Sequence, residues 1–350
     1  MAAPCEAGAD MTLLEIRDLT VEYRVGDGRL PAVRGVGLSV DEGEIVGIAG
    51  ESGCGKSTMA GAVLRLLPPA TQVSGQVLLN GEDVLTMPWG RLRAVRWSTA
   101  SIVFQGAMSC LNPVRRVGDQ IEEPILLHAK KGDPITTPKV LRRRVAELLE
   151  QVGVPDWRAY SYPHELSGGQ RQRVMIAMAL ACSPRLIIAD EPTTALDVMV
   201  QAQVMTLMKA LVKETGVGMM LISHDLSVIS DVCDRVAVMY AGRVVESGPA
   251  GSMFTDAVHP YARALVGAFP VIGDPVSRLA PRGLPGDPPD PRDLPPGCPF
   301  HLRCAVAVPE CSVDDVRLRV VPGSEGIRHA ACVHVGAEPA LVGPGSVEDR

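Results

Sequence analysis

The chain has 350 residues, of which 46% are hydrophobic and 21% are charged. This length exceeds what one ordinary domain needs, and the apolar fraction can bury a sizeable core, which excludes a wholly disordered chain. The formal net charge is −6 at pH 7, only 3% of the residues are aromatic, and no run of Lys or Arg forms a basic patch. Nucleic acid is therefore not expected as a partner.

The N-terminus gives no sign of export. Residues 1–11 carry acidic residues but no basic residue and no apolar stretch, so we expect a disordered N-terminus rather than a secretory signal. No apolar run reaches the ~18 residues of a membrane-spanning helix. We therefore expect a reduced, cytoplasmic setting, where clustered cysteines bind metal more often than they form disulfides.

The N-terminal part of the chain predicts strands around one helix. Short strands separated by turns are expected at residues 13–16, 21–23 and 36–40. The continuously apolar run 45–49 predicts a strand buried on both faces, as in a parallel sheet. Residues 58–67 have apolar residues at helical spacing and end before two prolines, which predicts a helix.

Strands and helices alternate along the chain until about residue 265. Residues 106–181 show helical spacing without β alternation, which predicts a helical subdomain inserted into the sheet. We therefore expect a main domain at 12–265, followed at 266–350 by a proline-rich linker and a cysteine-rich C-terminal extension. The other expected elements are strands at 75–79, 101–104, 186–189 and 218–222, a helix at 196–212 and a hairpin at 236–245.

One segment matches the phosphate-binding loop pattern G-x-x-x-x-G-K-[ST] at every position, between the buried strand and the helix. Its glycines let backbone N–H groups turn toward phosphate oxygens, and the helix N-terminus adds partial positive charge. Lys56 is expected to reach the β- and γ-phosphates of ATP and Ser57 to coordinate Mg²⁺, while Cys54 is a small filler rather than a nucleophile. A chance glycine-rich turn is the less favoured alternative. The expected nucleotide-binding residues here are Gly50, Glu51, Ser52, Gly53, Cys54, Gly55, Lys56, Ser57 and Thr58.

Two carboxylates end the apolar strand 186–189. Asp190 is placed to hold Mg²⁺, and Glu191 is placed to polarise an attacking water. A strand ending in Asp-Glu is ordinary by itself, but together with the phosphate-binding loop it predicts a P-loop nucleotide hydrolase.

The octet Leu166–Arg173 (LSGGQRQR) resembles the signature motif of ATP-binding cassette (ABC) ATPases at every position. Its residues Ser167, Gly168, Gly169 and Gln170 are expected to present a hydroxyl and backbone amides to phosphate at the start of a helix. The chain has a second expected phosphate site but only one lysine-bearing loop. This fits a head-to-tail pair of subunits, in which each subunit completes the nucleotide site of the other.

The resemblance to ABC ATPases implies further site residues. Gln105 resembles the Q-loop glutamine that touches Mg²⁺, and Tyr23 resembles the aromatic residue that stacks on adenine. Asp197, in Ala195-Leu196-Asp197, resembles the D-loop acid at the dimer seam. His224 resembles the switch histidine that contacts the γ-phosphate. The resemblance covers roughly residues 12–265 and implies an α/β fold, a P-loop ABC core with an antiparallel β subdomain.

Three segments resemble the oligopeptide/dipeptide/nickel importer branch of the ABC family. They are residues 104–113, where Gly106-Ala107 replaces the usual Asp-Pro, and the segments 259–265 and 297–304. This resemblance implies a peripheral ATPase at the cytoplasmic face of the membrane. The implied partners are a second ATPase subunit, identical or different, two transmembrane permease subunits and an extracytoplasmic substrate-binding protein. A soluble ABC ATPase acting on ribosomes or nucleic acid is the alternative function.

Four cysteines gather near the C-terminus with the spacing C-x5-C-x6-C-x20-C. This is not the paired C-x2-C of most structural zinc sites, and four thiolates can hold either Zn²⁺ or a 4Fe–4S cluster. The family resemblance implies the cluster. A structural staple is its simplest role, because we expect the proline-rich tail to have little apolar surface of its own. The four residues are Cys298, Cys304, Cys311 and Cys332.

Overall fold

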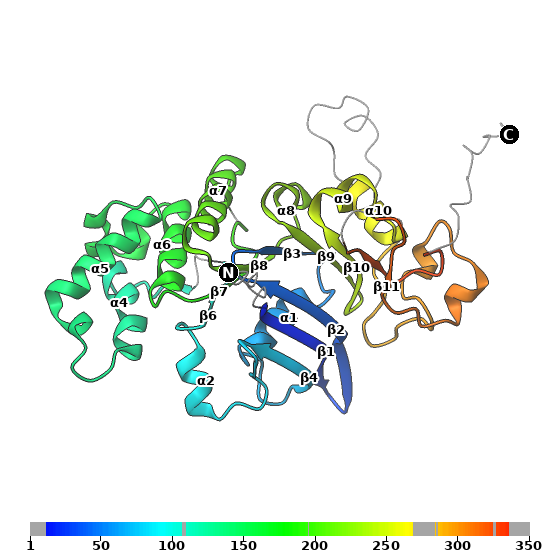
Figure 1. Ribbon diagram of the computed structural model, residues 1–350, viewed down its shortest axis with the longest axis horizontal. Coiled ribbons are helices and arrows are strands. Elements are labelled where there is room, and N and C mark those ends of the chain that lie inside the picture. Colours follow the sequence, from blue (N-terminus) through cyan, green and yellow to red (C-terminus); the bar gives the residue numbers. More distant parts are fainter. Residues whose placement is uncertain are drawn as a thin grey trace, which may run out of the picture.

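The computed structural model describes residues 12–106, 110–194, 196–268, 284, 286–324 and 327–335. The expected disordered N-terminus at 1–11, and much of the expected linker, lie outside these residues. Figure 1 shows two sheets at the centre, helices α4, α5 and α6 at one end, and the C-terminal residues at the other. Within the described residues, no helix is long and apolar enough to cross a membrane.

The main sheet has eight strands in the order β11-β12-β10-β9-β3-β8-β7-β6. The five strands from β9 to β6 run parallel, and β10 folds back antiparallel on β9 as the expected hairpin. All five residues of β3 are buried, as the apolar run predicts. The bounds are β3 Ile45–Ala49, β6 Ala100–Val103, β7 Leu186–Asp190, β8 Gly218–Ile222, β9 Arg235–Tyr240, β10 Arg243–Pro249, β11 Arg319–Val320 and β12 His329–Ala330.

The second sheet is antiparallel, in the order β2-β1-β4-β5, and it corrects one expectation. The short strands expected at 13–16 and 21–23 form one continuous strand, β1 (Thr12–Val25). A bulge where Asp18 adopts φ 50° shifts the alternation of inward residues, which made the strand look broken. The remaining strands are β2 Gly28–Asp41, β4 Gln72–Leu79 and β5 Glu82–Asp83.

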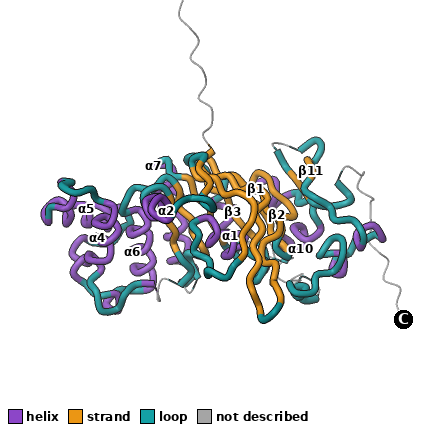
Figure 2. The backbone as a smooth tube through the Cα atoms, turned by 90° about the horizontal axis from the view of Figure 1, so that it is seen from below, coloured by secondary structure: helices purple, strands orange, loops and turns teal. Residues whose placement is uncertain are grey.

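Helices cover the main sheet and fill the inserted region. Helix α1 starts earlier and ends earlier than the expected 58–67, since it begins within the phosphate-binding loop. The described residues of the region 106–181 contain helices and no strand, and the helices α4, α5 and α6 pack on one another (Figures 1 and 2). The helices are α1 Lys56–Val63, α2 Trp89–Val95, α4 Val117–His128, α5 Pro138–Gln151, α6 Gly168–Leu180, α7 Val198–Thr215, α8 Leu226–Val232, α9 Ala250–Thr255 and α10 Pro260–Gly267. Short 3-10 helices are η1 Pro134–Thr136, η2 Asp156–Tyr160, η3 Pro163–Glu165, η4 His301–Arg303 and η5 Pro309–Ser312.

Two hydrophobic cores lie on opposite faces of the main sheet. From β3, Ile45 and Ala49 enter the core under the helices, whereas Val46 and Ile48 enter the core shared with the antiparallel sheet and α1. Burial on both faces fixes β3 firmly, and the phosphate-binding loop follows it directly.

The C-terminal segment, by which we mean residues 286–324 and 327–335, is joined to the main fold. Strand β12 pairs with β10 and so extends the main sheet. Phe300 is only 2% exposed and belongs to the core under the helices. The tail buries little apolar surface, as expected from the sequence, but the ring of Phe300 anchors it in the core.

Candidate nucleotide-binding site

The phosphate-binding loop needs glycine at two positions because neighbouring backbone approaches closely. Gly50 has φ 149°, and a Cβ there would lie 2.3 Å from the carbonyl oxygen of Met239. Gly55 has φ 103°, and its Cβ would lie 2.2 Å from the carbonyl oxygen of Ala32. Any side chain at these positions would displace β9 or β2, so the loop conformation depends on both glycines.

Lys56 lies inside the curl of this loop and is 5% exposed. Its Nζ donates to the carbonyl oxygens of Gly50 at 2.7 Å and Glu51 at 2.9 Å, and it approaches Cys54 Sγ at 3.7 Å. These carbonyls hold the ammonium group within the loop, where phosphate oxygens are expected. Cys54 is buried, and burial raises the pKa of its thiol, which fits a filler rather than a nucleophile.

Ser57 and Asp190 meet across the site although they are 133 positions apart. The Ser57 hydroxyl donates to Asp190 Oδ1 at 2.9 Å. Burial raises the pKa of Asp190, and the hydrogen bond from Ser57 partly opposes that rise. A hydroxyl beside a carboxylate is a donor set that suits Mg²⁺, so these two residues fit the expected metal position.

Glu191 is the most connected carboxylate of the site. It adopts φ 46° directly after β7, a left-handed conformation that is uncommon for non-glycine residues. Its Oε2 accepts hydrogen bonds from Gln105 Nε2 at 2.7 Å and from Thr194 Oγ1 at 3.0 Å, and His224 Nδ1 lies 3.5 Å away. The structure thus brings together the three catalytic residues expected from the sequence. Thr194 was missed; a backbone turn, in which its N–H donates to the Glu191 carbonyl oxygen at 3.2 Å, brings its hydroxyl to that carboxylate.

Tyr23 lies near the start of α1. Its hydroxyl is 3.1 Å from Thr58 Oγ1, which joins β1 to the first turn of the helix. The loop residues Ser52 and Gly53 are exposed. The expected adenine-stacking residue therefore lies beside the expected phosphate site.

The LSGGQ residues begin α6, on a different part of the structure. Ser167 and Gln170 form a reciprocal cap, in which Ser167 Oγ accepts from Gln170 N at 3.3 Å and Gln170 Oε1 accepts from Ser167 N at 3.2 Å. A Cβ on Gly169 would lie 2.5 Å from Val200 of α7, while Gly168 has more room beside Leu196. Helix α6 packs on α4, α5, α7 and β6, whereas α1 packs on β1, β2 and β7.

Asp197 caps the next helix. Its Oδ1 accepts a hydrogen bond from Val200 N at 3.0 Å at the start of α7. Of the expected D-loop, Ala195 lies outside the described residues. The carboxylate thus has a structural partner within this chain, and its expected place at a dimer seam stays a prediction.

The C-terminal segment reaches the phosphate-binding loop, a contact that no sequence pattern predicted. Arg303 forms a two-pronged ion pair with Glu51, with Nη1 to Oε2 at 2.8 Å and Nη2 to Oε1 at 3.0 Å. The Tyr261 hydroxyl accepts a hydrogen bond from the Glu51 backbone N–H at 2.9 Å. No local pattern could have revealed contacts over 252 and 210 positions of sequence.

The four clustered cysteines line one small pocket together with His301 and His334. Burial raises the pKa of the thiols of Cys298, Cys304 and Cys332. As these side chains stand, however, no group of three or more His, Cys, Asp or Glu residues in the described part of the chain is arranged to hold a metal ion. The structure therefore does not support the expected zinc or iron–sulfur site directly.

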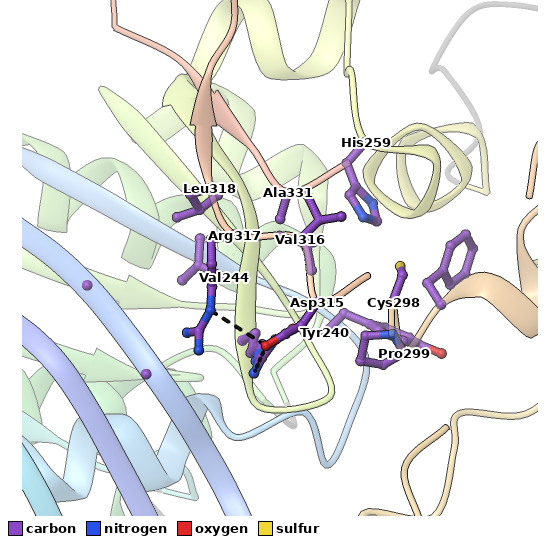
Figure 3. Close-up of a pocket in the computed structure, with 15 residues that line it drawn as sticks. Tyr240, Val244, His259, Cys298, Pro299, Asp315, Val316, Arg317, Leu318 and Ala331 are labelled. Carbon is purple, nitrogen blue, oxygen red and sulfur yellow. Dashed lines mark hydrogen bonds and ion pairs between the residues drawn. The ribbon is translucent and has the colours of Figure 1, made fainter. Parts of the chain in front are cut away.

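A larger pocket opens between β2, β10 and the C-terminal segment. Figure 3 shows Tyr240, His259, Cys298 and Pro299 on its lining. None of the residues that line it belongs to the expected nucleotide site, so we assign it no part in ATP binding.

Similarity to known proteins agrees with the geometry. Residues 33–194 match the family model for the ABC transporter, and residues 245–311 match that for the oligopeptide/dipeptide transporter C-terminal region. The chain is 42% identical to the dipeptide transport ATP-binding protein DppD of Bacillus subtilis, over 89% of this chain and 90% of that protein. The chain belongs to the ABC transporter ATP-binding family. The resemblance to the oligopeptide/dipeptide importer branch is thereby confirmed.

Other relatives of this ABC ATPase differ in length. It is 44% identical to the oligopeptide transport ATP-binding protein OppD of Escherichia coli, over 86% of this chain and 88% of that protein. It is 45% identical to OppD of Mycobacterium tuberculosis over 92% of this chain, but it spans only 52% of that relative. Among solved structures, the dimeric ABC transporter cassette MJ0796 is similar with a TM-score of 0.61 and 30% identity, covering 68% of this chain and 98% of that one. A post-hydrolysis state of the same cassette with ADP and Pi matches equally well.

Proposed function

We propose that this ABC ATPase hydrolyses ATP to drive the import of di- or oligopeptides, or of a related small solute such as nickel, through separate permease subunits. The observation that carries the proposal is the Glu191 carboxylate, held by Gln105 and Thr194 beside His224. The names of the relatives, oligopeptide and dipeptide transport ATP-binding proteins, support the cargo class.

The catalytic roles follow from the positions of the side chains. Lys56 would leave the loop carbonyls to pair with the β- and γ-phosphates, and Ser57 with Asp190 would hold Mg²⁺, which neutralises phosphate charge. Glu191 would accept a proton from the water that attacks the γ-phosphorus, while the bond to the ADP oxygen breaks. Gln105 and Thr194 orient that carboxylate, and His224 is placed to contact the γ-phosphate.

A dimer would complete the nucleotide site. The loop at α1 and the capped start of α6 belong to different parts of one subunit, so a nucleotide on the loop would be closed by Ser167, Gly168, Gly169 and Gln170 of a second subunit. The similar cassette MJ0796 is described as dimeric, which supports this arrangement. The second subunit is an identical chain or a related ABC ATPase.

The remaining partners follow from the transport role. We place the protein at the cytoplasmic face of the membrane, bound peripherally to two permease subunits that receive cargo from an extracytoplasmic binding protein. The test is co-expression with candidate peptide permeases, followed by reconstitution into vesicles. We expect ATP-dependent uptake of a labelled dipeptide or oligopeptide, or else of nickel. Co-purification with ribosomes and no uptake would favour the alternative function, which the relatives do not support.

We also propose that the four clustered cysteines bind a 4Fe–4S cluster. The support is that all four line one pocket, and that a backbone N–H lies against the sulfur of three of them, which opposes part of the rise in thiol pKa that burial causes. Such donors stabilise the thiolates that bind iron. A single Zn²⁺ needs four sulfurs at ~2.3 Å from one centre, whereas each cysteine of a cluster binds a different iron, so the sulfurs stand farther apart. The three N–H donors are Phe300, Val306 and His334.

Anaerobic purification tests the cluster. We expect a brown protein with about four iron atoms per chain and little zinc. The Cys311→Ser variant should lose the colour, whereas the Cys110→Ser variant, which alters an exposed cysteine outside the set, should keep it. Colourless wild-type protein that lacks iron under these conditions would contradict the proposal, and one zinc atom per chain would support the alternative ion.

A further inference from the structure

Glu51, the second residue of the phosphate-binding loop, is paired with a residue from the other end of the chain. The Arg303 guanidinium makes two parallel contacts to its carboxylate, at 2.8 and 3.0 Å. The Arg303 side chain is 7% exposed and that of Glu51 is 22% exposed. A two-pronged pair that is largely shielded from water fixes both the distance and the orientation of the two groups.

The backbone of Glu51 is held as well. Its N–H donates to the Tyr261 hydroxyl at 2.9 Å, and its carbonyl oxygen accepts from Lys56 Nζ at 2.9 Å. Glu51 therefore has contacts on its side chain, its N–H and its carbonyl. Two of these come from residues beyond position 260, and the third is the lysine expected to bind phosphate.

The position of Arg303 is set by aromatic packing. Phe300, three residues earlier, packs against Tyr240 and Tyr261, with ring centroids 5.3 Å apart in both pairs. The Arg303 Nη1 atom also donates to the Tyr240 hydroxyl at 3.2 Å, and its guanidinium lies 5.8 Å from the Tyr240 ring centroid. Figure 3 shows Tyr240 close to the chain at Cys298 and Pro299, where this segment reaches the sheet. Because Phe300 is buried in the core, it fixes the position of the short segment from which Arg303 reaches Glu51.

We propose that Arg303 is a positioning residue for nucleotide binding, which holds Glu51 and neutralises its charge so that the loop can accept a triphosphate. The inference rests on the proposed ATPase function. Without Arg303, a free carboxylate would remain in the loop that binds ATP and would repel its phosphates. The Glu51 backbone, against which Lys56 rests, would also lose one of its anchors.

Neutralisation of the Glu51 charge by Arg303 predicts a specific order of ATP affinities among variants. The Arg303→Gln variant should bind ATP about tenfold more weakly or worse, because it leaves the partly buried charge of Glu51 unpaired beside the phosphates. Removing both charges, in the Glu51→Gln/Arg303→Gln variant, should restore affinity to within about threefold, since replacing both partners of such a pair is often close to neutral. Arg303→Lys keeps the charge but not the two-pronged geometry, so it should fall between wild type and Arg303→Gln.

The measurement is titration of the full-length chain with Mg²⁺ and a non-hydrolysable ATP analogue, together with KM and kcat in the assembled transporter. KM should rise in Arg303→Gln while kcat changes little. The matched control is Arg292→Gln, which breaks the exposed pair between Arg292 and Asp290 in the same segment and should leave affinity unchanged. Circular dichroism and thermal unfolding without nucleotide identify any variant that has not folded. If Arg303→Gln does not fold, the affinities of the double variant and of Arg303→Lys test the inference.

Two results would overturn the inference. Wild-type affinity in a folded Arg303→Gln variant would show that the pair only attaches the tail. Equal loss in the single and double variants would show that charge neutralisation plays no part. If the wild-type protein itself bound no ATP analogue, the proposed ATPase function would fail along with the inference. In the first two results the wild-type protein still binds the analogue, so only the role of Arg303 is overturned.

Discussion

The Gln105 carboxamide donates a hydrogen bond to the Glu191 carboxylate, with 2.7 Å between Nε2 and Oε2. The register of two neighbouring parallel strands produces this contact. Strand β6 pairs with β7 so that Val103 lies opposite Ala189, and each functional residue follows two positions later. The two side chains therefore leave the same edge of the sheet side by side, where open α/β sheets bind their ligands.

We predict that Glu191→Gln abolishes ATP hydrolysis and preserves ATP binding. The amide keeps the shape of the side chain and can still bond Thr194, but it cannot accept a proton from water, so turnover should fall by at least about a hundredfold. Phosphate release by the assembled transporter measures hydrolysis, and titration with ATP measures binding. The control is Glu42→Gln, which changes an exposed glutamate paired with Arg185. Undiminished turnover would rule out Glu191 as the base.

The contact between Ser57 and Asp190 predicts a Mg²⁺-specific defect. Asp190→Asn removes the anionic ligand, so affinity for Mg²⁺–ATP should fall about tenfold or more, while binding of ATP with EDTA present should change little. Acid should weaken Mg²⁺–ATP binding in the wild type at a higher pH than for an ordinary aspartate, because burial raises the pKa of Asp190 and only the ionised carboxylate binds the metal. Calorimetry with and without Mg²⁺ separates these effects.

The control for Asp190 is Asp27→Asn, which changes an exposed aspartate in the turn between β1 and β2. That variant should bind Mg²⁺–ATP as the wild type does. An equal loss of affinity with Mg²⁺ and with EDTA in Asp190→Asn would place the residue's effect on the loop rather than on the metal.

The site could be predicted where its residues lie on short local patterns. The strand Ile45–Ala49 is buried on both faces, which its continuous run of apolar residues indicates. The loop after it passes close to the backbone of β9 and β2, which its glycines indicate. Glu191 and His224 each follow a buried strand, and parallel strands end at one edge. Their meeting therefore follows from the topology once the strands are placed.

The rest depends on contacts between distant segments. The bulge at Asp18 hid the continuity of β1, because it shifts the alternation on which strand prediction relies. The pairing of Arg303 with Glu51 leaves no mark at either position, since an isolated arginine and an isolated glutamate are ordinary surface residues. The burial of Phe300 in the core, three residues before Arg303, helps to bring this segment to the loop.

The buried His259 predicts a loss of stability in acid. It is 1% exposed, and its Nδ1 accepts a hydrogen bond from Tyr261 N at 3.1 Å, so the ring must be neutral. Burial lowers its pKa to about 4, whereas an unfolded histidine takes up a proton near its ordinary pKa of 6.5. The neutral ring therefore contributes fully to folding stability above pH 6.5. As the pH falls toward 4, about 3 kcal/mol of that stability is lost.

The His259→Asn variant isolates this effect. Asparagine can accept the same hydrogen bond at the start of α10 but does not titrate in this range. Thermal unfolding between pH 7.5 and 4 should show a smaller decline for the variant than for the wild type. Parallel curves for the two proteins would show that another group controls the acid sensitivity.

The ion pair between Glu246 and Arg328 predicts how firmly the C-terminal segment is attached. Arg328 Nη2 lies 2.9 Å from Glu246 Oε1, and the side chains are 3% and 0% exposed. The same carboxylate accepts the backbone N–H groups of Val258 and His259 at 2.7 to 3.1 Å, so it joins β10, the start of α10 and the residue before β12. Arg328 Nη1 also lies 3.5 Å from the carboxylate of Asp256, but that side chain is 80% exposed. Glu246→Gln therefore removes the buried partner of the guanidinium and leaves only the exposed one, which should cost up to about 3–5 kcal/mol of folding stability.

The size of that loss distinguishes a buried pair from an exposed one. Glu147→Gln breaks the exposed pair with Arg143 on α5 and should cost no more than about 0.5 kcal/mol. The Glu246→Gln/Arg328→Met variant should recover part of the loss, because no buried charge then lacks a partner. Denaturant unfolding of the three variants measures all of these quantities. Equal, small losses in Glu246→Gln and Glu147→Gln would mean that water reaches the pair and that β12 is held by its strand pairing instead.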